Sequence, residues 1–595
     1  MTTKKLDVVT LEVLRNVLPA ITNEMSYVLQ RTSYNMMIYD VRDYCCALLD
    51  TEGRLLAQNT GGVSHFVTDM GTLIKDAVTR FGKESFRRGD VVVTNHQRVA
   101  GQHLNNMMVY TPYFAEGELA GFAAVRAHWV DVGGVSTGFG AGGLAADPWM
   151  EGLQLDQVKL YEQGKLDEKV WSIIRDNIRF PQSSMGDLKS QIAACHLGEK
   201  RIEEIYDRYS RAIVEQGVER IFDQTEARCR AVVSGFRDGV YYSESLFRGL
   251  PADNNEPLQI KVKVTIQGGD MEVDLTQCSR ERRAAMNSRT LSAPVIAYKA
   301  ITLPTDPVNE GAFRGLKIKI QEGNYMMARY PAPMASWSSS LPTVVDTILH
   351  ALAPALSDKI PAGHLGVLGG TVVFFGANPG TGQRFVTQSI EGGGWGARPW
   401  EDGECAAVSV CQGDVRNAPI EKMELRWPVR VLRRELRRDS GGAGKFRGGL
   451  GLDTEVMGLV EGSWNVFDSG RDNYPPQGLN GGLQGEPSAH FLRLPGEAEF
   501  RYVKLTRHAV PEGAQAIVAT AGGGGWGNPL GRDPEKVRWD VIEGYVSIEA
   551  AQKNYGVVLE QKTLAINREA TERLRAQMAA SAQGPDHSPQ HYKEN

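Results

Sequence analysis

Two histidines in the first quarter of the chain have the surroundings of a reactive site. His103 lies in a glycine-led loop and His128 ends an apolar run. Loops and strand ends of a rigid scaffold often present side chains to a cleft. With Asp40, Asn106 and Asp131, the two rings could form a nitrogen-and-oxygen metal site or a general acid–base set working near neutral pH. Histidines at this spacing are more often separate structural residues, so the spacing alone does not show that the two belong to one site.

Glycine-packed loops form a second group of candidates, at 391–398 and 439–451. Their exposed N–H groups could bind an anion such as phosphate or carboxylate, with charge added by Arg398 and Arg447. The alternative is a set of tight turns in which glycine supplies a positive φ. We expect turns and close-approach loops around an internal cavity, with positive φ at Gly393, Gly441 and Gly524.

Nucleophilic and nucleotide-binding motifs are missing from the sequence. Ser64-His65 and Ser440 lie in no Gly-x-Ser-x-Gly elbow, so a Ser/His/Asp triad is not indicated. No Gly-x-x-x-x-Gly-Lys-Ser/Thr loop is present either. We therefore expect any ATP to be bound by another protein.

The composition excludes several classes of protein. The chain has 595 residues, with 66 Lys and Arg against 71 Asp and Glu. This balance favours neither nucleic acid nor an anionic membrane as a partner. No apolar run is long enough to span a bilayer, and the first residues do not resemble a secretion signal. Seven cysteines without a C-x-x-C pair are typical of reduced thiols in a cytoplasmic protein.

Hydrophobic periodicity predicts the elements that position these residues. Apolar residues recur at steps of three and four over 10–32, which indicates a helix that Pro19 could kink or break. Short strands are expected at 45–50, 89–95 and 119–128. Helices follow at 166–177 and, as a pair, at 187–233.

The pattern changes near residue 235, where period-two alternation over 258–266 predicts a strand that enters a hairpin at Gly268-Gly-Asp. We expect an α+β protein of several domains. These are an N-terminal mixed domain with the histidine site (1–235), a β-rich middle domain (236–362), a Gly-rich β domain (363–532), C-terminal helices (533–578) and a disordered tail (579–595).

Several motifs, in order along the chain, resemble the hydantoinase B family. They include Thr10-Leu-Glu-Val-Leu-Arg-Asn, Arg42-Asp-Tyr-Cys-Cys-Ala-Leu-Leu-Asp, Gly186-Asp-Leu-Lys-Ser-Gln-Ile-Ala-Ala, Asn309-Glu-Gly-Ala-Phe-Arg and Asp439-Ser-Gly-Gly-Ala-Gly. The family includes the B half of 5-oxoprolinase, the B-type component of N-methylhydantoinase, the caprolactamase β component, and components of acetone and acetophenone carboxylases.

The resemblance implies a heteromeric enzyme. An A-type subunit uses ATP with Mg to phosphorylate a carbonyl or amide oxygen, and the B-type subunit completes the reaction; the complex can include a small accessory subunit. In family members whose B-type subunit holds zinc or manganese, the ligands correspond position by position to Asp40, His103, Asn106 and His128.

Departures from the family pattern lead us to favour one reaction. Asn106 stands where an aspartate is usual, and the lost charge weakens the hold on a divalent cation. Trp129 and Met107 would make the pocket suit a flat apolar substrate. We therefore expect a subunit like that of acetophenone carboxylase, an ATP-dependent ketone carboxylase that uses bicarbonate. The alternatives are a cyclic amide hydrolase and a structural subunit with a decayed site.

We assign roles accordingly. The expected catalytic residues are His103, His128 and Asp131, and the expected substrate contacts are Met107, Trp129 and Arg398.

Overall fold

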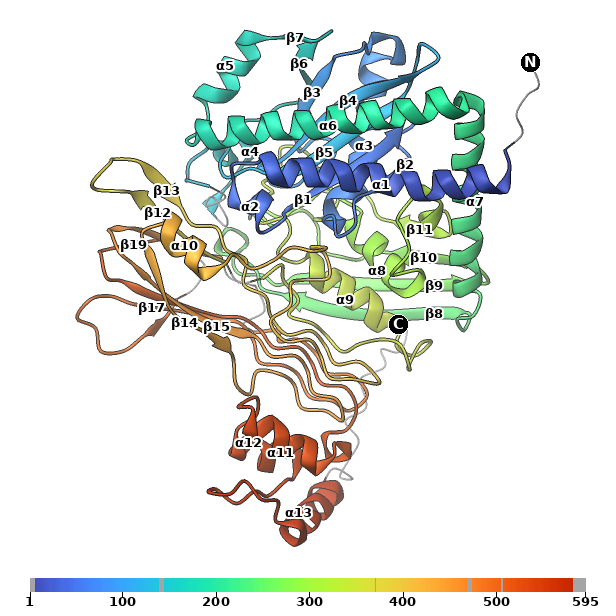
Figure 1. Cartoon of the computed structure of the whole chain (residues 1–595). Helices are drawn as coiled ribbons and strands as arrows, with labels where there is room; N and C mark the ends of the chain where they lie inside the picture. The colour runs from blue at the N-terminus through green and yellow to red at the C-terminus, as the bar shows by residue number, and fades with distance from the viewer. Residues whose placement is uncertain (1–5, 139–143, 370, 468–472, 504–506, 582–595) are drawn as a thin grey trace.

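The computed structural model describes residues 6–138, 144–369, 371–467, 473–503 and 507–581. Helices and several separate sheets make up the chain (Figure 1), and the predicted α+β class is confirmed. Within the described ranges, no helix is both long and apolar enough to cross a bilayer. The proposed division into domains stays a prediction.

The first sheet has seven strands in the order β2-β1-β5-β4-β3-β6-β7, all paired antiparallel. The strands predicted at 45–50, 89–95 and 119–128 are β1, β3 and β5 of this sheet. The bounds are β1 Tyr44–Asp50, β2 Leu55–Gln58, β3 Val91–Thr94, β4 Asn106–Ala115, β5 Glu118–His128, β6 Val158–Glu162 and β7 Lys165–Leu166.

Helices cover both faces of this sheet. On one face α1 (Val8–Thr32) and α6 (Pro181–Tyr209) pack in a single apolar cluster with the strands, and α3 (Ser64–Phe81) belongs to the cluster on the other face. Pro19 lies inside α1 without ending it. The predicted helix pair is confirmed as α6 and α7 (Arg211–Val233). Shorter helices are α2 Met36–Tyr39, α4 Pro148–Glu151 and α5 Glu168–Asp176.

A second sheet, in the order β11-β10-β9-β8, packs with α8 and α9. The predicted hairpin joins β9 and β10. The bounds are β8 Gly239–Phe247, β9 Leu258–Gln267, β10 Asp270–Asp274, β11 Leu316–Lys319, α8 Ser292–Thr302 and α9 Leu341–Ala351.

Two further sheets, β13-β12-β16-β19 and β14-β15-β20-β17-β18, share one apolar cluster. Their bounds are β12 Thr371–Ala377, β13 Arg384–Val386, β14 Val429–Leu436, β15 Leu452–Gly458, β16 Gly462–Phe467, β17 Ala489–Arg493, β18 Arg501–Tyr502, β19 Arg507–Val510 and β20 Gln515–Ala519, with α10 at Ile420–Arg426. The last described helices are α11 Pro534–Ile542, α12 Ile548–Tyr555 and α13 Arg568–Ser581; the predicted tail lies almost wholly outside the described residues.

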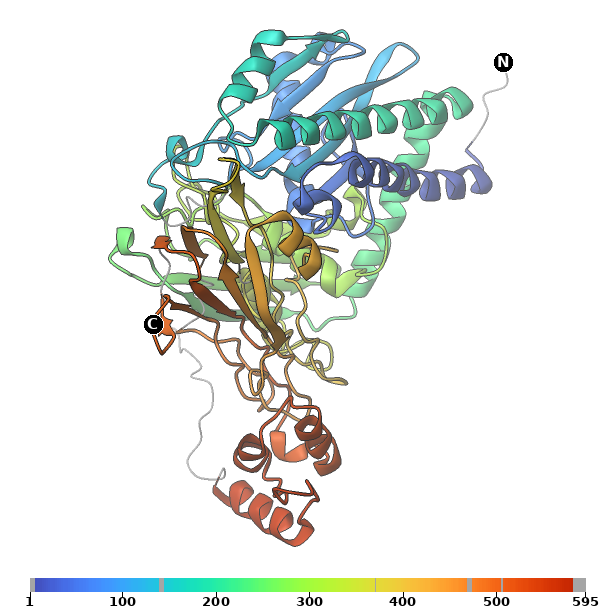
Figure 2. The same ribbon diagram turned by 60° about the vertical axis from the view of Figure 1, so that its left-hand side comes forward.

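Between these sheets and the C-terminal helices, long extended segments run side by side (Figures 1 and 2). We call this the glycine bundle, made of residues 362–365, 392–397, 403–407, 440–451, 477–485 and 521–527. Its segments bond to one another through backbone groups: Gly394 N donates to Ala521 O (2.9 Å), Gly449 N to Trp395 O (2.8 Å) and Gly523 N to Gly449 O (2.9 Å).

The bundle requires glycine for close approach. A Cβ on Gly396 would lie 1.7 Å from the Ala362 carbonyl oxygen, and one on Gly524 would lie 2.0 Å from that of Gln477. The predicted close approach is therefore confirmed. The predicted positive φ at Gly393, Gly441 and Gly524 is wrong, because these glycines lie in extended segments rather than turns.

Candidate functional site

Three polar side chains meet at one edge of the first sheet because their strands are neighbours. Asn106, the first residue of β4, is paired with His128, the last residue of β5. The His128 N–H donates to the Asp43 carbonyl, just before β1 (3.1 Å). Alternate residues of a strand face opposite sides of a sheet, and these three share the face covered by α3. The fold thus gathers residues that are far apart in the sequence.

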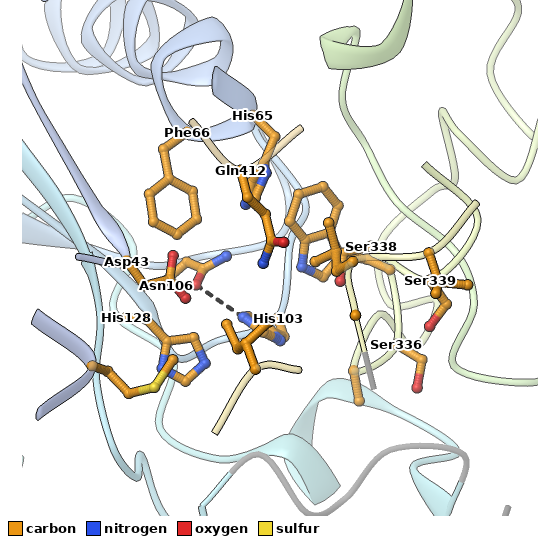
Figure 3. Close-up of a pocket in the computed structure, with 17 residues that line it drawn as sticks. Asp43, His65, Phe66, His103, Asn106, His128, Ser336, Ser338, Ser339 and Gln412 are labelled. Atoms are coloured by element: carbon orange, nitrogen blue, oxygen red, sulfur yellow. Dashed lines mark hydrogen bonds between the residues drawn. The ribbon is translucent and has the colours of Figure 1, made fainter. Parts of the chain in front are cut away.

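The three residues line a cavity of about 100 Å³ (Figure 3). His65 and Phe66 come from the first turn of α3, and His103 from the loop before β4. The remaining walls come from segments near the second sheet and the glycine bundle: Ala335–Ser339, Val367–Gly369, Ile390 and Gln412, besides Met37 of α2.

The histidines are packed close together and are hydrogen-bonded. The ring centroids of His103 and His128 are 5.0 Å apart, and those of His65 and Trp337 are also 5.0 Å apart. His103 Nε2 lies 2.9 Å from Asn106 Oδ1. His65 Nδ1 lies 2.8 Å from the Cys411 carbonyl, to which it must donate, so its Nε2 carries a lone pair.

Burial sets the charge of these groups. Desolvation lowers the pKa of His65 to about 3 and that of His103 to about 4, and it lowers the pKa of His128 well below its usual value. The rings are therefore neutral at neutral pH. Desolvation raises the pKa of the Asp43 carboxyl to about 7. Among the described residues, no donor hydrogen-bonds to this carboxyl group, so it stays poised near neutral pH.

Two more polar atoms of the pocket lack a partner. Within the described parts of the chain, the buried Trp337 Nε1–H meets no acceptor and the buried Gln412 Oε1 meets no donor. Each such group costs about 1–3 kcal/mol when left unsatisfied. A ligand that supplies an acceptor to Trp337 and a donor to Gln412 would recover this free energy.

The pocket does not fit the metal site that the resemblance implies. In the described ranges, no three His, Cys, Asp or Glu side chains converge closely enough to hold an ion. Of the four expected ligands, His103 and Asn106 form a hydrogen bond with each other. Asp40 lies outside the pocket, where its carboxylate accepts two hydrogen bonds from Lys422 Nζ (2.7 and 2.9 Å). The described residues therefore do not form the zinc or manganese site that the resemblance implies.

Two expected substrate contacts face the wrong side of the sheet. Met107 and Trp129 follow Asn106 and His128 by one residue, so their side chains point away from the pocket into the cluster under α1 and α6. Both are fully buried, and Trp129 Nε1 donates to Gln191 Oε1 (2.8 Å). The prediction that Met107 and Trp129 line the pocket is therefore wrong, because successive residues of a strand face opposite sides of the sheet.

Asp131 and Arg398 also lie away from the pocket lining. The buried Asp131 carboxylate accepts hydrogen bonds from the N–H groups of Gly133 and Gly138 and pairs with Arg179 at 3.0 Å. These contacts give it a structural role. Arg398 forms an ion pair with Glu401 three residues away.

Four residues of the pocket were not selected from the sequence: Asp43, His65, Trp337 and Gln412. For Asp43 a signal existed, because it directly precedes a buried strand that lies beside the strand ending at His128. His65 follows Ser64, and this pair suggests only a Ser/His/Asp triad that no motif supports. Trp337 and Gln412 lie in irregular segments, where no periodicity indicates direction.

Comparisons with known proteins agree with this architecture. The sequence model of the family described as Hydantoinase B/oxoprolinase matches residues 7–529. A protein named as the B component of a D-/L-hydantoinase, from Pseudomonas sp. (strain NS671), is 31% identical over 599 residues, covering 96% of this chain and 98% of that protein. The crystal structure of ATP-dependent caprolactamase from Pseudomonas jessenii has a TM-score of 0.87 at 27% identity, covering 96% of this chain and 100% of the other. A nucleotide-free acetone carboxylase structure, with a TM-score of 0.88 at 20% identity over 97% of this chain and 84% of the other, shares the fold.

Proposed function

The chain belongs to the Hydantoinase B/oxoprolinase family, and from this premise we propose that it is the B-type subunit of an ATP-dependent cyclic amide hydrolase. Its active site is the pocket around Asp43, His103 and His128. Because the sequence has no phosphate-binding loop, the ATP and its Mg belong to an A-type partner protein. That partner phosphorylates the amide oxygen, and this chain carries out the hydrolysis.

The pairing of unsatisfied atoms carries this choice. A cyclic amide phosphorylated on its oxygen keeps its ring N–H as a cationic C=N–H group, which matches Gln412 Oε1, and its phosphorylated oxygen matches the Trp337 Nε1–H. A ketone or its enol phosphate offers no such N–H donor. The chain also shares more sequence with a hydantoinase component and a caprolactamase than with an acetone carboxylase.

Asp43 is the proposed general base. A carboxylate with a pKa of about 7 can take a proton at neutral pH and return it. It takes one proton from a water as the water oxygen bonds to the amide carbon. The ring C–N bond then breaks, and both protons of that water end on the ring nitrogen, which departs as an ammonium group. The acyl phosphate left behind is hydrolysed by a second water to a carboxylate and inorganic phosphate.

Ketone carboxylation is the second candidate, and the apolar part of the pocket supports it. Phe66, Trp337 and Ile390 provide walls that suit a flat apolar substrate and that exclude water. Water exclusion protects an enol phosphate and a carboxyphosphate, since both hydrolyse. On this alternative the partner proteins phosphorylate the ketone and bicarbonate.

Reconstitution with the partner proteins separates the candidates. ATP turnover is measured with lactams and hydantoins, and with acetone and acetophenone, each with and without bicarbonate. We expect turnover with a cyclic amide that does not depend on bicarbonate and that releases an amine. Turnover that needs both a ketone and bicarbonate would replace the hydrolase with the carboxylase. Full turnover after His103→Ala and His128→Ala together would instead indicate a structural role for this chain.

A further inference from the structure

A row of buried polar side chains leads from Asp69 of α3 to His103. Gln102 Nε2 donates to Asp69 Oδ2 (2.6 Å), and Asn106 Nδ2 donates to Gln102 Oε1 (2.7 Å). Asn106 Oδ1 then faces His103 Nε2 at 2.9 Å. Asp69, Gln102 and Asn106 are each at most 4% exposed. Asp69 and Gln102 do not line the pocket and are shielded from water, so the polar groups of the row must satisfy one another.

The direction of every hydrogen bond in the row follows from one end. Gln102 Nε2 lies near two acceptors, the Asp69 carboxylate and the backbone carbonyl of His65 (2.9 Å). A backbone carbonyl only accepts, so this end of the Gln102 amide must be its NH₂ group. The Gln102 oxygen then faces Asn106, so Asn106 must donate to it from its own NH₂ group. The Asn106 oxygen is left to face His103.

Asp69 is fixed in turn by its surroundings. Its other carboxylate oxygen accepts a hydrogen bond from Thr290 Oγ1 (2.8 Å), and Arg126 Nη1 lies 3.8 Å from Oδ2. The Arg126 guanidinium is itself buried, and its Nε donates to the Asn106 carbonyl (3.3 Å). Asp69 therefore has no freedom to turn away from Gln102.

We propose that Asp69 and Gln102 are positioning residues that hold the Asn106 oxygen against His103 and so fix the proton of His103 on Nε2. The tautomer of a histidine is set by the hydrogen bond that one of its nitrogens makes. With Nε2 donating to Asn106, only Nδ1 can accept a proton.

The His103 tautomer is a property of the free protein, whereas any role of His103 in catalysis rests on the proposed function. Asn106 is central to both. An asparagine has one acceptor end and one donor end, so its direction matters, whereas an aspartate would accept at both ends. The Asn106 amide must therefore be held in one orientation, and the hydrogen bond to the Gln102 oxygen holds it there.

The test is nitrogen NMR of the full-length protein labelled with ¹⁵N-histidine. The His103 signals are assigned by their loss in His103→Gln. We expect Nε2 to resonate as a protonated nitrogen and Nδ1 as an unprotonated one. Gln102→Lys should reverse the pattern, since an ammonium group can pair with Asp69 but only donates to Asn106, which must then turn its NH₂ group toward His103.

Two further variants keep the test decisive. Asn106→Asp retains an acceptor against His103, so the proton should stay on Nε2. Gln157→Lys alters another buried glutamine, bonded to Tyr110 and Leu73, and should leave the His103 signals unchanged. If Gln102→Lys does not fold, Gln102→Met should move the Nε2 signal toward the unprotonated value.

A proton on Nδ1 in the wild type, or unchanged signals in the folded Gln102 variant, would overturn the inference. The spectra need no turnover, so failure to hydrolyse any cyclic amide would remove the proposed function and leave this result standing.

Discussion

The glycine bundle and the pocket differ in how far their polar groups are hydrogen-bonded. In the bundle, backbone N–H groups donate to backbone carbonyls of neighbouring segments, as Gly524 N does to Gly363 O (2.7 Å). In the pocket, the Asp43 carboxyl, Trp337 Nε1 and Gln412 Oε1 have no hydrogen-bond partner within the described residues. Groups that are satisfied stabilise a fold, whereas buried groups left unsatisfied need a ligand.

This difference weakens the anion-binding interpretation of the glycine loops. Many of the N–H groups that would cradle a phosphate, such as those of Gly393, Gly394 and Gly449, already donate to backbone carbonyls within the bundle. Arg447, expected to add charge, is buried against Asp540 (3.4 Å) and donates to the Gly448 carbonyl (2.7 Å). The glycines allow backbones to approach, and the chemistry lies in the pocket.

The largest effect is expected from adding one methyl group to the bundle. Gly396→Ala would place a Cβ 1.7 Å from the Ala362 carbonyl oxygen, a contact that only a backbone shift can relieve. Overpacking of this kind costs about 3 kcal/mol or more. We expect loss of most folded protein, or a large fall in the denaturant midpoint measured by circular dichroism. The control is Gly380→Ala, whose nearest neighbour would be 3.4 Å away; equal stability of the two variants would contradict the account.

Next in size is the effect of removing the proposed base. Asp43→Asn should lower kcat of the reconstituted complex by about 100-fold or more, since general acid–base catalysis contributes about 10²–10⁴-fold. The fold should remain intact, because no described side chain bonds to this carboxyl group. The matched control is Asp40→Asn, which alters an exposed ion pair with Lys422 and should keep activity within about two-fold. If Asp40→Asn were the inactive variant, the pocket would be misassigned.

A smaller effect is expected at the unpaired acceptor of the pocket. Gln412→Leu should raise KM for a cyclic amide by about 10-fold, because it removes the partner of the ring N–H, worth about 1 kcal/mol or more. Steady-state kinetics measure this, and thermal unfolding of the variant should match the wild type or exceed it. An unchanged KM would mean that the ring N–H does not contact Gln412.

The smallest effect is expected at Arg398. Its side chain pairs with Glu401 at the surface and does not line the pocket. Arg398→Ala should change KM by less than about two-fold and stability by less than about 1 kcal/mol. A KM increase of 10-fold or more would restore the original prediction that this arginine binds substrate.

The sequence was a good guide to elements with a strong period. The helix over α1, the α6–α7 pair and the β9–β10 hairpin were all predicted from spacing. The structure places His103, Asn106 and His128 in the lining of one pocket, and the roles expected of them stay predictions. The same reasoning failed for Met107 and Trp129, although period two alone forbids consecutive residues of a strand from sharing a face.

Other parts of the site could not be predicted from the sequence. Trp337 and Gln412 lie more than 200 residues after His128 in irregular segments, and long-range packing alone brings them to the pocket. The position-by-position correspondence with the family selected Asp40, whereas the pocket is lined by Asp43, three residues later. Close approach at the glycines was predicted correctly, but the positive φ expected of turns was not found, because the glycines at 393, 441 and 524 lie in segments packed side by side.

The pH dependence of kcat/KM tests the central claim that Asp43 is the base of the active site. Its pKa is raised to about 7 by burial, and a base works only when deprotonated. Activity should rise with pH to a plateau above about 7, while Asp43→Asn shows no such rise.

Stability should change in the opposite direction. Below about pH 4 the Asp43 carboxyl is protonated in both the folded and the unfolded protein. Between about pH 4 and pH 7 it ionises only in the unfolded protein, because burial raises its pKa in the folded protein to about 7. The free energy of unfolding therefore falls as pH rises through this range, by on the order of a few kcal/mol. Asp43→Asn should escape this loss. A wild-type kcat/KM profile without a rise near pH 7, or an Asp43→Asn profile that keeps both the rise and the full activity, would contradict the account.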